Sequence, residues 1–288
     1  MAPPKVWLIT GCSTGFGHEL ALQALQRGEK VIATARNISK LNALKEAGAA
    51  TLQLDVTANL DPLKKVAEMA NGIHGRIDVL VNNAAFVVDG PVEETTPEET
   101  QSIFSTNVFG LLNMIRAITP YMRAQRSGII ANFSSIGGWG GFPGCALYTA
   151  TKWAVSGISE SLVDELKPFG ITVTCIEPGY FRSDLLTASN RKSPQIHIAD
   201  YDGTPGRETM DLLDAVNRKQ PGDIVKGCKV LLDILTQSGV AGGREIPIRV
   251  ALGPDSAPFI EKKCQETIKL VGEWKDVTVK TNHDDVKE

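Results

Sequence analysis

Short apolar runs of strand length alternate with segments of helical periodicity along most of this chain of 288 residues. The alternation repeats six times. Strands that are separated by helices pair in parallel, and the helices then cover both faces of the sheet. The sequence therefore predicts an α/β fold with a doubly wound parallel sheet, three α/β/α layers and a single domain. The expected strands lie at 5–10, 30–35, 51–57, 78–85, 129–133 and 171–177.

The length agrees with one large domain, because no repeat or shift in composition divides the chain. We expect this domain to span residues 1–275 and a polar tail to follow at 276–288. From about 184 to 222 both periodicities fail, and polar, turn-rich segments replace them. A long irregular insertion of this kind is typical of a substrate lid, so we predict a lid there. Beyond it we expect a helix at 223–235, a strand at 246–252 and a helix at 258–274.

Composition argues against several classes of protein. The formal net charge is only −3 and no basic stripe is present, which argues against nucleic acid as a partner. The longest apolar stretches have strand length, below the roughly 20 residues that span a bilayer, so we expect no membrane segment. Five scattered cysteines without a C-x-x-C pair, and the lack of a signal-peptide pattern, predict free thiols and a cytoplasmic location. The four histidines do not cluster, so we expect no metal site.

A glycine-rich turn joins the first expected strand to the first expected helix. It runs from Gly11 to Gly17, with a third glycine at Gly15. Such a turn lets the backbone approach a pyrophosphate, and the N-terminus of the following helix supplies N–H groups and a favourable dipole. The turn therefore predicts a dinucleotide site. It also matches G-x-S-x-G, the nucleophile elbow of serine hydrolases, but only one strand precedes Ser13 and His283 lies in the polar tail.

The end of the second expected strand bears on the choice of cofactor. An NAD site usually has an acidic residue here, which binds the ribose 2′-hydroxyl. This chain has Ala35 followed by Arg36. A guanidinium binds a 2′-phosphate well, so the sequence favours NADP(H) over NAD. Thr34 and Asn37 are candidates for secondary hydrogen bonds.

A tyrosine and a lysine stand four residues apart at the start of a predicted helix. Tyr148 and Lys152 therefore lie one above the other on one helical face. A nearby ammonium lowers the pKa of a phenol, which makes the pair a general acid–base device. Ser135 follows the strand at 129–133, at the edge of the sheet where α/β proteins place ligands.

Other polar residues occupy positions that need a reason. Asn107 lies within a long predicted helix at 97–126, where asparagine competes for backbone hydrogen bonds. Asp55 ends the third expected strand and is a candidate for the adenine pocket. Asn82 and Asn83 end the fourth, where they either tie strands together or line the cofactor cleft.

Taken together, these motifs resemble the classical short-chain dehydrogenases/reductases, which have a Rossmann fold. The resemblance covers about residues 5–250, with Ala85 in place of a common glycine and Ser183 in place of a common threonine. The matching motifs are Thr10-Gly-x-x-x-Gly-x-Gly17, Asp55, Asn82-Asn-Ala, Asn107, Ser135, Tyr148-x-x-x-Lys152 and Pro178-Gly179.

The resemblance implies a catalytic tetrad of Asn107, Ser135, Tyr148 and Lys152. The tyrosine exchanges a proton with the substrate oxygen, and the serine orients that oxygen. The lysine lowers the tyrosine pKa and holds the nicotinamide ribose, and the asparagine anchors a water. We expect NADP(H) to contact Gly11, Ser13, Thr14, Gly15, Phe16, Gly17, Arg36, Asp55, Val56, Asn82, Asn83, Tyr148, Lys152, Pro178, Gly179, Phe181 and Ser183.

The expected function is an NADP-dependent oxidoreductase, a carbonyl reductase that interconverts a ketone or aldehyde and an alcohol. The residues expected near the substrate are mostly apolar, which suits a lipophilic molecule. The alternative is a non-catalytic NADP sensor, although such a protein has no need of Tyr148 or Lys152. The family also implies a homodimer or homotetramer through the long helices. The expected substrate-site residues are Phe86, Val87, Trp139, Phe142, Cys145, Tyr180 and Leu185.

Overall fold

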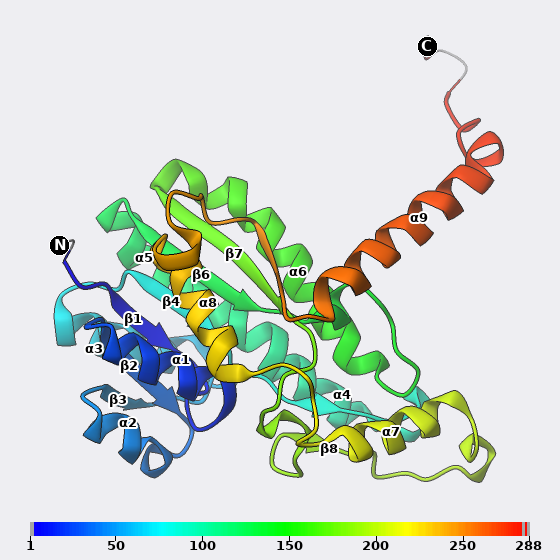
Figure 1. Ribbon diagram of the computed structural model, residues 1–288, viewed down its shortest axis with the longest axis horizontal. Coiled ribbons are helices and arrows are strands. Elements are labelled where there is room, and N and C mark those ends of the chain that lie inside the picture. Colours follow the sequence, from blue (N-terminus) through cyan, green and yellow to red (C-terminus); the bar gives the residue numbers. More distant parts are fainter. Residues whose placement is uncertain (1–2, 284–285, 287–288) are drawn as a thin grey trace.

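Seven parallel strands form the central sheet of the computed structural model, which describes residues 3–283 and 286 (Figure 1). The chain first builds one side of the sheet and then returns past β1 to build the other, so the order reverses between β1 and β4. A crevice opens at such a reversal, outside the carboxyl ends of the strands. In sheet order the strands are β3 (Ala50–Gln53), β2 (Lys30–Ala35), β1 (Val6–Ile9), β4 (Val79–Asn82), β6 (Gly128–Phe133), β7 (Ile171–Pro178) and β9 (Arg249–Leu252).

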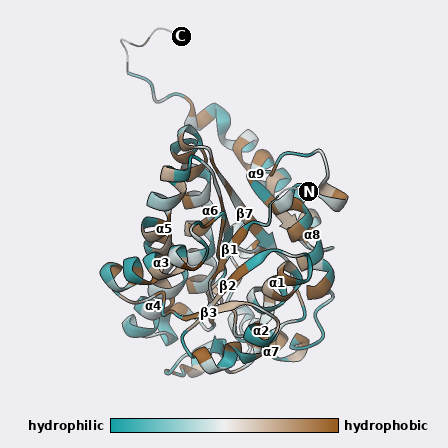
Figure 2. Ribbon diagram, turned by 90° about the vertical axis from the view of Figure 1, so that its left-hand side faces the viewer, coloured by the Kyte–Doolittle hydropathy of each residue, from teal (hydrophilic) through white to brown (hydrophobic). Residues whose placement is uncertain are grey.

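Both faces of the sheet are buried under helices, which confirms the doubly wound α/β fold in three layers (Figure 2). Side chains alternate along β1: Trp7 and Ile9 enter one core, and Val6 and Leu8 enter the other. A strand buried on both faces reads as a continuous apolar run, which is why the strands were visible in the sequence. One face carries α1 (Gly15–Gln26), α2 (Asn42–Glu46) and α8 (Ile224–Thr236); the other carries α3 (Leu60–His74), α5 (Leu111–Gln125) and α6 (Ala146–Leu166).

The long helix predicted at 97–126 is interrupted. It begins as α4 (Pro97–Phe104), where Thr96 and Glu99 form a reciprocal capping box and Pro97 takes the first helical position. A π-helical turn then spans Ser105–Gly110 before α5 continues in the same direction. This wide turn contains Asn107, so the residue that looked out of place in the sequence marks the irregularity.

The insertion, residues 184–222, is more ordered than predicted. It contains the short strand β8 (Arg191–Lys192), which pairs in parallel with β5 (Val87–Val88), and the helix α7 (Pro205–Val216). The expectation of an irregular segment was therefore wrong. Proline at the first position starts α7, and Met210 and Leu213 bury its inner face, although turn-rich segments surround this short helix in the sequence.

The last helix, α9 (Ser256–Thr278), leaves the body of the molecule and extends outward (Figure 1). It continues three residues into the stretch predicted as a polar tail, of which residues 284–285 and 287–288 lie outside the described part. Within the described residues, no helix combines the length and the apolar character that a bilayer crossing requires.

Candidate active site

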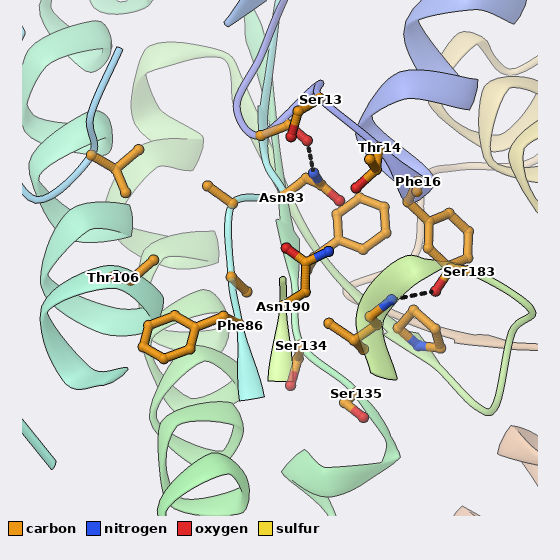
Figure 3. A pocket seen from close by; sticks show the side chains of 18 of the residues that line it. Ser13, Thr14, Phe16, Asn83, Phe86, Thr106, Ser134, Ser135, Ser183 and Asn190 are labelled. Carbon is orange, nitrogen blue, oxygen red and sulfur yellow. Dashed lines mark hydrogen bonds between the residues drawn. The ribbon is translucent and has the colours of Figure 1, made fainter. Parts of the chain in front are cut away.

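A cavity of about 210 Å³ lies at the crevice, outside the carboxyl ends of the strands (Figure 3). All the residues predicted to contact the cofactor line it, except Gly17 and Asn82. Strands far apart in the sequence therefore place these side chains around one space, as parallel strands must. Ser135, Tyr148 and Lys152 share the same cavity, while Asn107 lies behind its wall.

The turn between β1 and α1 is held by a side chain from the neighbouring strand. Gly11 and Gly15 both adopt positive φ, of 71° and 63°. Asn83 Nδ2 donates to the carbonyls of Thr10 at 2.9 Å and Gly11 at 3.1 Å. A Cβ at Gly17 would stand 2.5 Å from that Nδ2, so Gly17 permits the close packing of the turn rather than lining the cavity.

The side chain of Asn82 also does not line the cavity. Its Nδ2 donates to Asn132 Oδ1 at 2.9 Å, and Asn132 Nδ2 donates to Ser159 Oγ at 3.0 Å. The chain of amides ties β4 to β6 and β6 to α6. Of the two roles left open for Asn82, the structure shows the one that ties strands together.

Residues at the ends of β2 and β3 line one end of the cavity. Asp55 Oδ1 accepts from the amide and the hydroxyl of Thr57, at 2.9 and 2.7 Å, which fixes its carboxylate. Gln53 Nε2 donates to the carbonyl of Arg36 at 3.0 Å, and the side chain of Arg36 is exposed. Thr34 is fully buried and donates to the carbonyl of Ile9, so its predicted secondary hydrogen bond to the cofactor is wrong.

Lys152 is buried and is held by the strand beside it. Its Nζ donates to the carbonyl of Phe133 at 2.8 Å and lies 5.6 Å from the ring centroid of Tyr148. Ser135 Oγ accepts from the amide of Gly137 at 3.1 Å, so its own hydrogen remains available to donate. A hydroxyl, a phenol and an ammonium thus converge from the end of β6 and the first turns of α6.

Burial governs the ionisation of the two titratable groups. It raises the pKa of Tyr148 to about 12, although the hydrogen bond with Ser135 acts to lower it. Burial also lowers the pKa of Lys152 to about 8. The protein alone therefore does not show the lowered tyrosine pKa that the spacing predicted, because loss of solvation outweighs the hydrogen bond with Ser135. Tyr148 stays protonated at neutral pH.

Asn107 positions the wall of the cavity. Its Oδ1 accepts from the amide of Phe86 at 3.1 Å, and its Nδ2 donates to the Phe86 carbonyl at 3.0 Å. The same Nδ2 donates to Thr151 Oγ1 at 3.1 Å. The buried amide thereby joins the segment after β4 to the helix that carries Tyr148 and Lys152.

Several lining residues were not predicted. Thr106 adjoins Asn107, and Ser134 immediately precedes Ser135, so their neighbours in the sequence were signals for both. Asn190 had no local signal, because the pairing of β5 with β8 brings it to the cavity. The lining residues outside the predicted site sets are Ala35, Leu54, Ala84, Ala85, Thr106, Phe133, Ser134 and Asn190.

A second cavity, of about 90 Å³, adjoins the first and shares Ser135 and Tyr148 with it. Phe86 lines the first cavity instead of the second. Trp139 lines neither, because its ring packs under the guanidinium of Arg249 at 4.3 Å, so its predicted place was wrong. Of the predicted substrate-site residues, the second cavity contains Val87, Phe142, Cys145, Tyr180 and Leu185. The insertion adds Leu186, Thr209, Leu213 and Gln220.

No group of three or more potential metal ligands from histidine, cysteine, aspartate and glutamate occurs in the part of the chain that the structure describes. The polar groups of the lining are instead hydroxyls, amides, the Lys152 ammonium, the Arg36 guanidinium and the Asp55 carboxylate. Backbone N–H groups at the start of α1 face the glycine turn, where an added Cβ at Gly11 would stand 2.9 Å from the Ala84 backbone. This close backbone cradle fits the pyrophosphate of a dinucleotide.

Known proteins are similar to this chain in both sequence and fold. The oxidoreductase BOA17 of Botryotinia fuckeliana is 33% identical over 279 residues, which cover 96% of this chain and 98% of that protein. A short-chain dehydrogenase structure from Streptomyces avermitilis has a TM-score of 0.87 and 36% identity, covering 98% of this chain and all of the other. ElxO, solved with NADP bound, has a TM-score of 0.68 and 26% identity over 86% of this chain and 96% of its own.

The model of the short chain dehydrogenase family matches residues 5–194, which include the glycine turn and the tyrosine–lysine pair. The sequence match, the parallel sheet and the crevice with its converging hydroxyls all agree with that model. The chain belongs to the short chain dehydrogenase family of oxidoreductases.

Proposed function

We propose that the protein is an NADP(H)-dependent oxidoreductase that interconverts a ketone or aldehyde and an alcohol on a lipophilic small molecule. One observation carries the proposal: Ser135 and Tyr148 line both cavities. The larger cavity has the glycine turn and helix N-terminus that suit a dinucleotide, and the smaller one is mostly apolar. A carbonyl bound in the smaller cavity therefore has two hydroxyl donors at its oxygen.

The residues of the larger cavity suit NADP(H). The turn from Gly11 to Phe16 is the place for the pyrophosphate, and exposed Arg36 is the place for the 2′-phosphate. ElxO, a relative by fold, was solved with NADP bound, which supports this choice. The nicotinamide supplies or accepts the hydride when bound.

The chain's own residues handle the proton. Tyr148 is protonated at neutral pH because its pKa is about 12, so it is ready to donate to the oxygen of a carbonyl substrate. The Ser135 hydroxyl polarises that oxygen. Lys152, held by Phe133, keeps a positive charge below pH 8 beside the tyrosine. These are the ionisation states in which the chain can donate a proton to a carbonyl oxygen.

A panel of ketones, aldehydes, diketones, quinones, steroids and retinoids, with consumption of NADPH or NADH as the readout, tests the proposal. We expect turnover of at least one lipophilic carbonyl compound, faster with NADPH. The variant Lys152→Met is the matched control for contaminating reductases in the preparation. Absence of turnover across the panel, with a folded protein, would refute the proposed reaction.

We also propose that the protein assembles as a homodimer or homotetramer. Phe109, at the end of the π-helical turn, and Trp153, on α6, keep 47% and 50% of their surface exposed on the long helices. Large apolar side chains at such positions suit a helix-to-helix interface between copies. Light scattering at micromolar concentration tests this, and a monomer there contradicts it.

We propose the cytoplasm as the location. The structure places Cys12, Cys145, Cys175 and Cys228 as buried free thiols. Free thiols persist in reducing compartments. Fractionation of cells that produce the protein, with a marker enzyme for each compartment, tests the assignment.

A further inference from the structure

Gln220 lines the second cavity with an amide that has no hydrogen-bond partner in the described part of the chain. The residue is 2% exposed, and its Oε1 has almost no accessible surface, so the amide atom left to meet a ligand is Nε2. The backbone of Gln220 is engaged, because its carbonyl accepts from Arg182 Nη2 at 3.2 Å. The residue is therefore held in place by its main chain while its side chain faces the space beside Tyr148.

An unpaired amide is unusual in such a place. Most buried polar atoms in native proteins have a hydrogen-bond partner, and one without a partner destabilises the folded state. A second polar side chain of the cavity, Thr209, shows the ordinary arrangement: its hydroxyl donates to the carbonyl of Pro205 at 2.9 Å. If Gln220 had a structural role, we would expect its amide to have a hydrogen-bond partner within the protein, as the Thr209 hydroxyl has. Its free Nε2 donor instead matches an acceptor that arrives with a ligand.

The other residues of the cavity define the chemistry of that ligand. The side chains that line the cavity are uncharged residue types, and burial raises the pKa of Cys145 to about 11, so its thiol is also neutral. A carboxylate or phosphate would lose its hydration there without a cation to replace it. The ligand is therefore neutral, with polar groups where Ser135, Tyr148, Tyr180 and Gln220 can meet them.

We propose that Gln220 determines substrate specificity by binding a second polar group of the substrate, in addition to the oxygen that reacts. The Nε2 of the amide is a donor, and the oxygen of a hydroxyl accepts from it. The substrate class is thus a neutral, lipophilic hydroxyketone, or the corresponding diol in the oxidative direction. This inference rests on the proposed reaction, because Ser135 and Tyr148 are taken to hold the reacting oxygen.

Paired substrates of graded length test the inference. The probes are 2-alkanones of four to eight carbons and the same ketones with a terminal hydroxyl, each assayed with NADPH. At one chain length we expect kcat/KM of the wild type for the hydroxyketone to exceed that for the plain ketone by about tenfold, the factor of one net hydrogen bond. In Gln220→Leu, which keeps the volume but removes the amide, we expect the ratio to fall to one or below.

The variant Thr209→Val is the matched control. It also changes a polar lining residue, but its hydroxyl is already bonded to Pro205, so the hydroxyketone preference should persist. A ratio that is the same in wild type and Gln220→Leu at every chain length overturns the inference and leaves the proposed reaction standing.

Two further measurements separate the possible failures. Saturation-transfer NMR with the same probes, in the presence of NADPH, reports binding without turnover. A hydroxyketone preference in binding that Gln220→Leu abolishes supports the inference even if no ketone is reduced, which would refute only the proposed reaction.

Thermal unfolding of Gln220→Leu shows whether the residue is structural. Removal of an unpaired buried amide should leave the unfolding temperature equal to that of the wild type or raise it by about 2–4 °C. A fall of more than about 5 °C would show that the amide stabilises the protein, and this overturns the inference. Gln220→Met, which also keeps the volume with a flexible side chain, repeats the comparison if the leucine packs poorly.

Discussion

The cofactor side and the substrate side of the crevice are built in different ways. The cofactor side consists of short motifs at the ends of strands, joined by neutral hydrogen bonds such as those from Asn83 to the glycine turn. The substrate side consists of the insertion and the segment after β4, which are joined by buried ion pairs. Arg191 Nε donates to Asp89 Oδ2 at 2.6 Å, and Arg207 Nη2 donates to Glu94 Oε1 at 2.5 Å.

The charged residues of the substrate side are deeply buried. The side chains of Asp89 and Glu94 have no exposed surface, and that of Arg191 keeps 6%. Each pair links residues more than 100 positions apart in the chain. Buried pairs add little net stability, but removal of one partner is costly because the other is left charged or must be neutralised. The cofactor side should therefore tolerate substitutions that the substrate side does not, and each prediction below tests that contrast.

The largest expected effect is on activity and comes from the cofactor side. Tyr148→Phe removes the proton donor and keeps the ring, so we expect kcat to fall by roughly 10²–10⁴-fold. The unfolding temperature should stay close to that of the wild type, because only one hydroxyl is lost. Steady-state kinetics and thermal unfolding measure both quantities. Near-normal turnover by this variant would contradict the assignment of Tyr148 as the proton donor.

The next effect is on stability and comes from the substrate side. Arg191→Leu leaves Asp89 buried without its partner, so we expect the free energy of unfolding to fall by about 3–5 kcal/mol. Urea unfolding measures it, with Arg36→Ala as the control, an exposed arginine whose loss should change stability by no more than about 0.5 kcal/mol.

The double variant Asp89→Leu/Arg191→Leu sharpens this test. It removes both buried charges, so it should recover much of the stability that Arg191→Leu loses. If Arg191→Leu lowers the free energy of unfolding by less than about 1 kcal/mol, the buried ion pairs do not make the substrate side more sensitive to substitution than the cofactor side.

The same contrast explains what the sequence could predict. The strands were visible because Val6 to Ile9 and their counterparts are apolar on both faces, and the cofactor side because residues such as Gly11 and Arg36 stand at strand ends. Parallel strands bring their carboxyl ends to the same edge of the sheet, irrespective of the conformations of the loops. The crevice and most of its lining followed from that geometry alone.

The substrate side could not be predicted in this way. β5 pairs with β8 beside the contact between Asp89 and Arg191, two residues that are 102 positions apart, so neither local segment carries a signal for it. Asn190 and Gln220 line the two cavities from the insertion, whose packing the local sequence does not reveal. Trp139 was misplaced for the same reason, because Arg249 on the last strand covers its ring.

A smaller effect concerns the choice of cofactor. Arg36→Ala removes the guanidinium that we assign to the 2′-phosphate, so we expect kcat/KM with NADPH to fall by roughly tenfold, at the low end for a charged hydrogen bond because the site is exposed. The value with NADH should not change, because NADH lacks that phosphate. Equal values for both cofactors in the wild type, or no loss with NADPH in the variant, would show that Arg36 is only a surface residue.

The smallest effect is the pH dependence of reduction. The pKa of Tyr148 is raised to about 12, so the proton donor is present throughout the range from pH 6 to 9. The pKa of Lys152 is lowered to about 8, so its charge is present below that pH and is lost above it. The reductive kcat/KM should therefore be level from pH 6 to 7 and should have fallen about twofold at the lysine pKa.

Lys152→Arg tests the cause of that decline, because a guanidinium keeps its charge over the whole range. Whatever activity this variant retains should show no decline near pH 8. Burial lowers the pKa of Lys152 toward neutral, so we assign this limb to the buried ammonium. A wild-type profile that falls toward pH 6 instead, and stays level through pH 8, would contradict the assignment to Lys152.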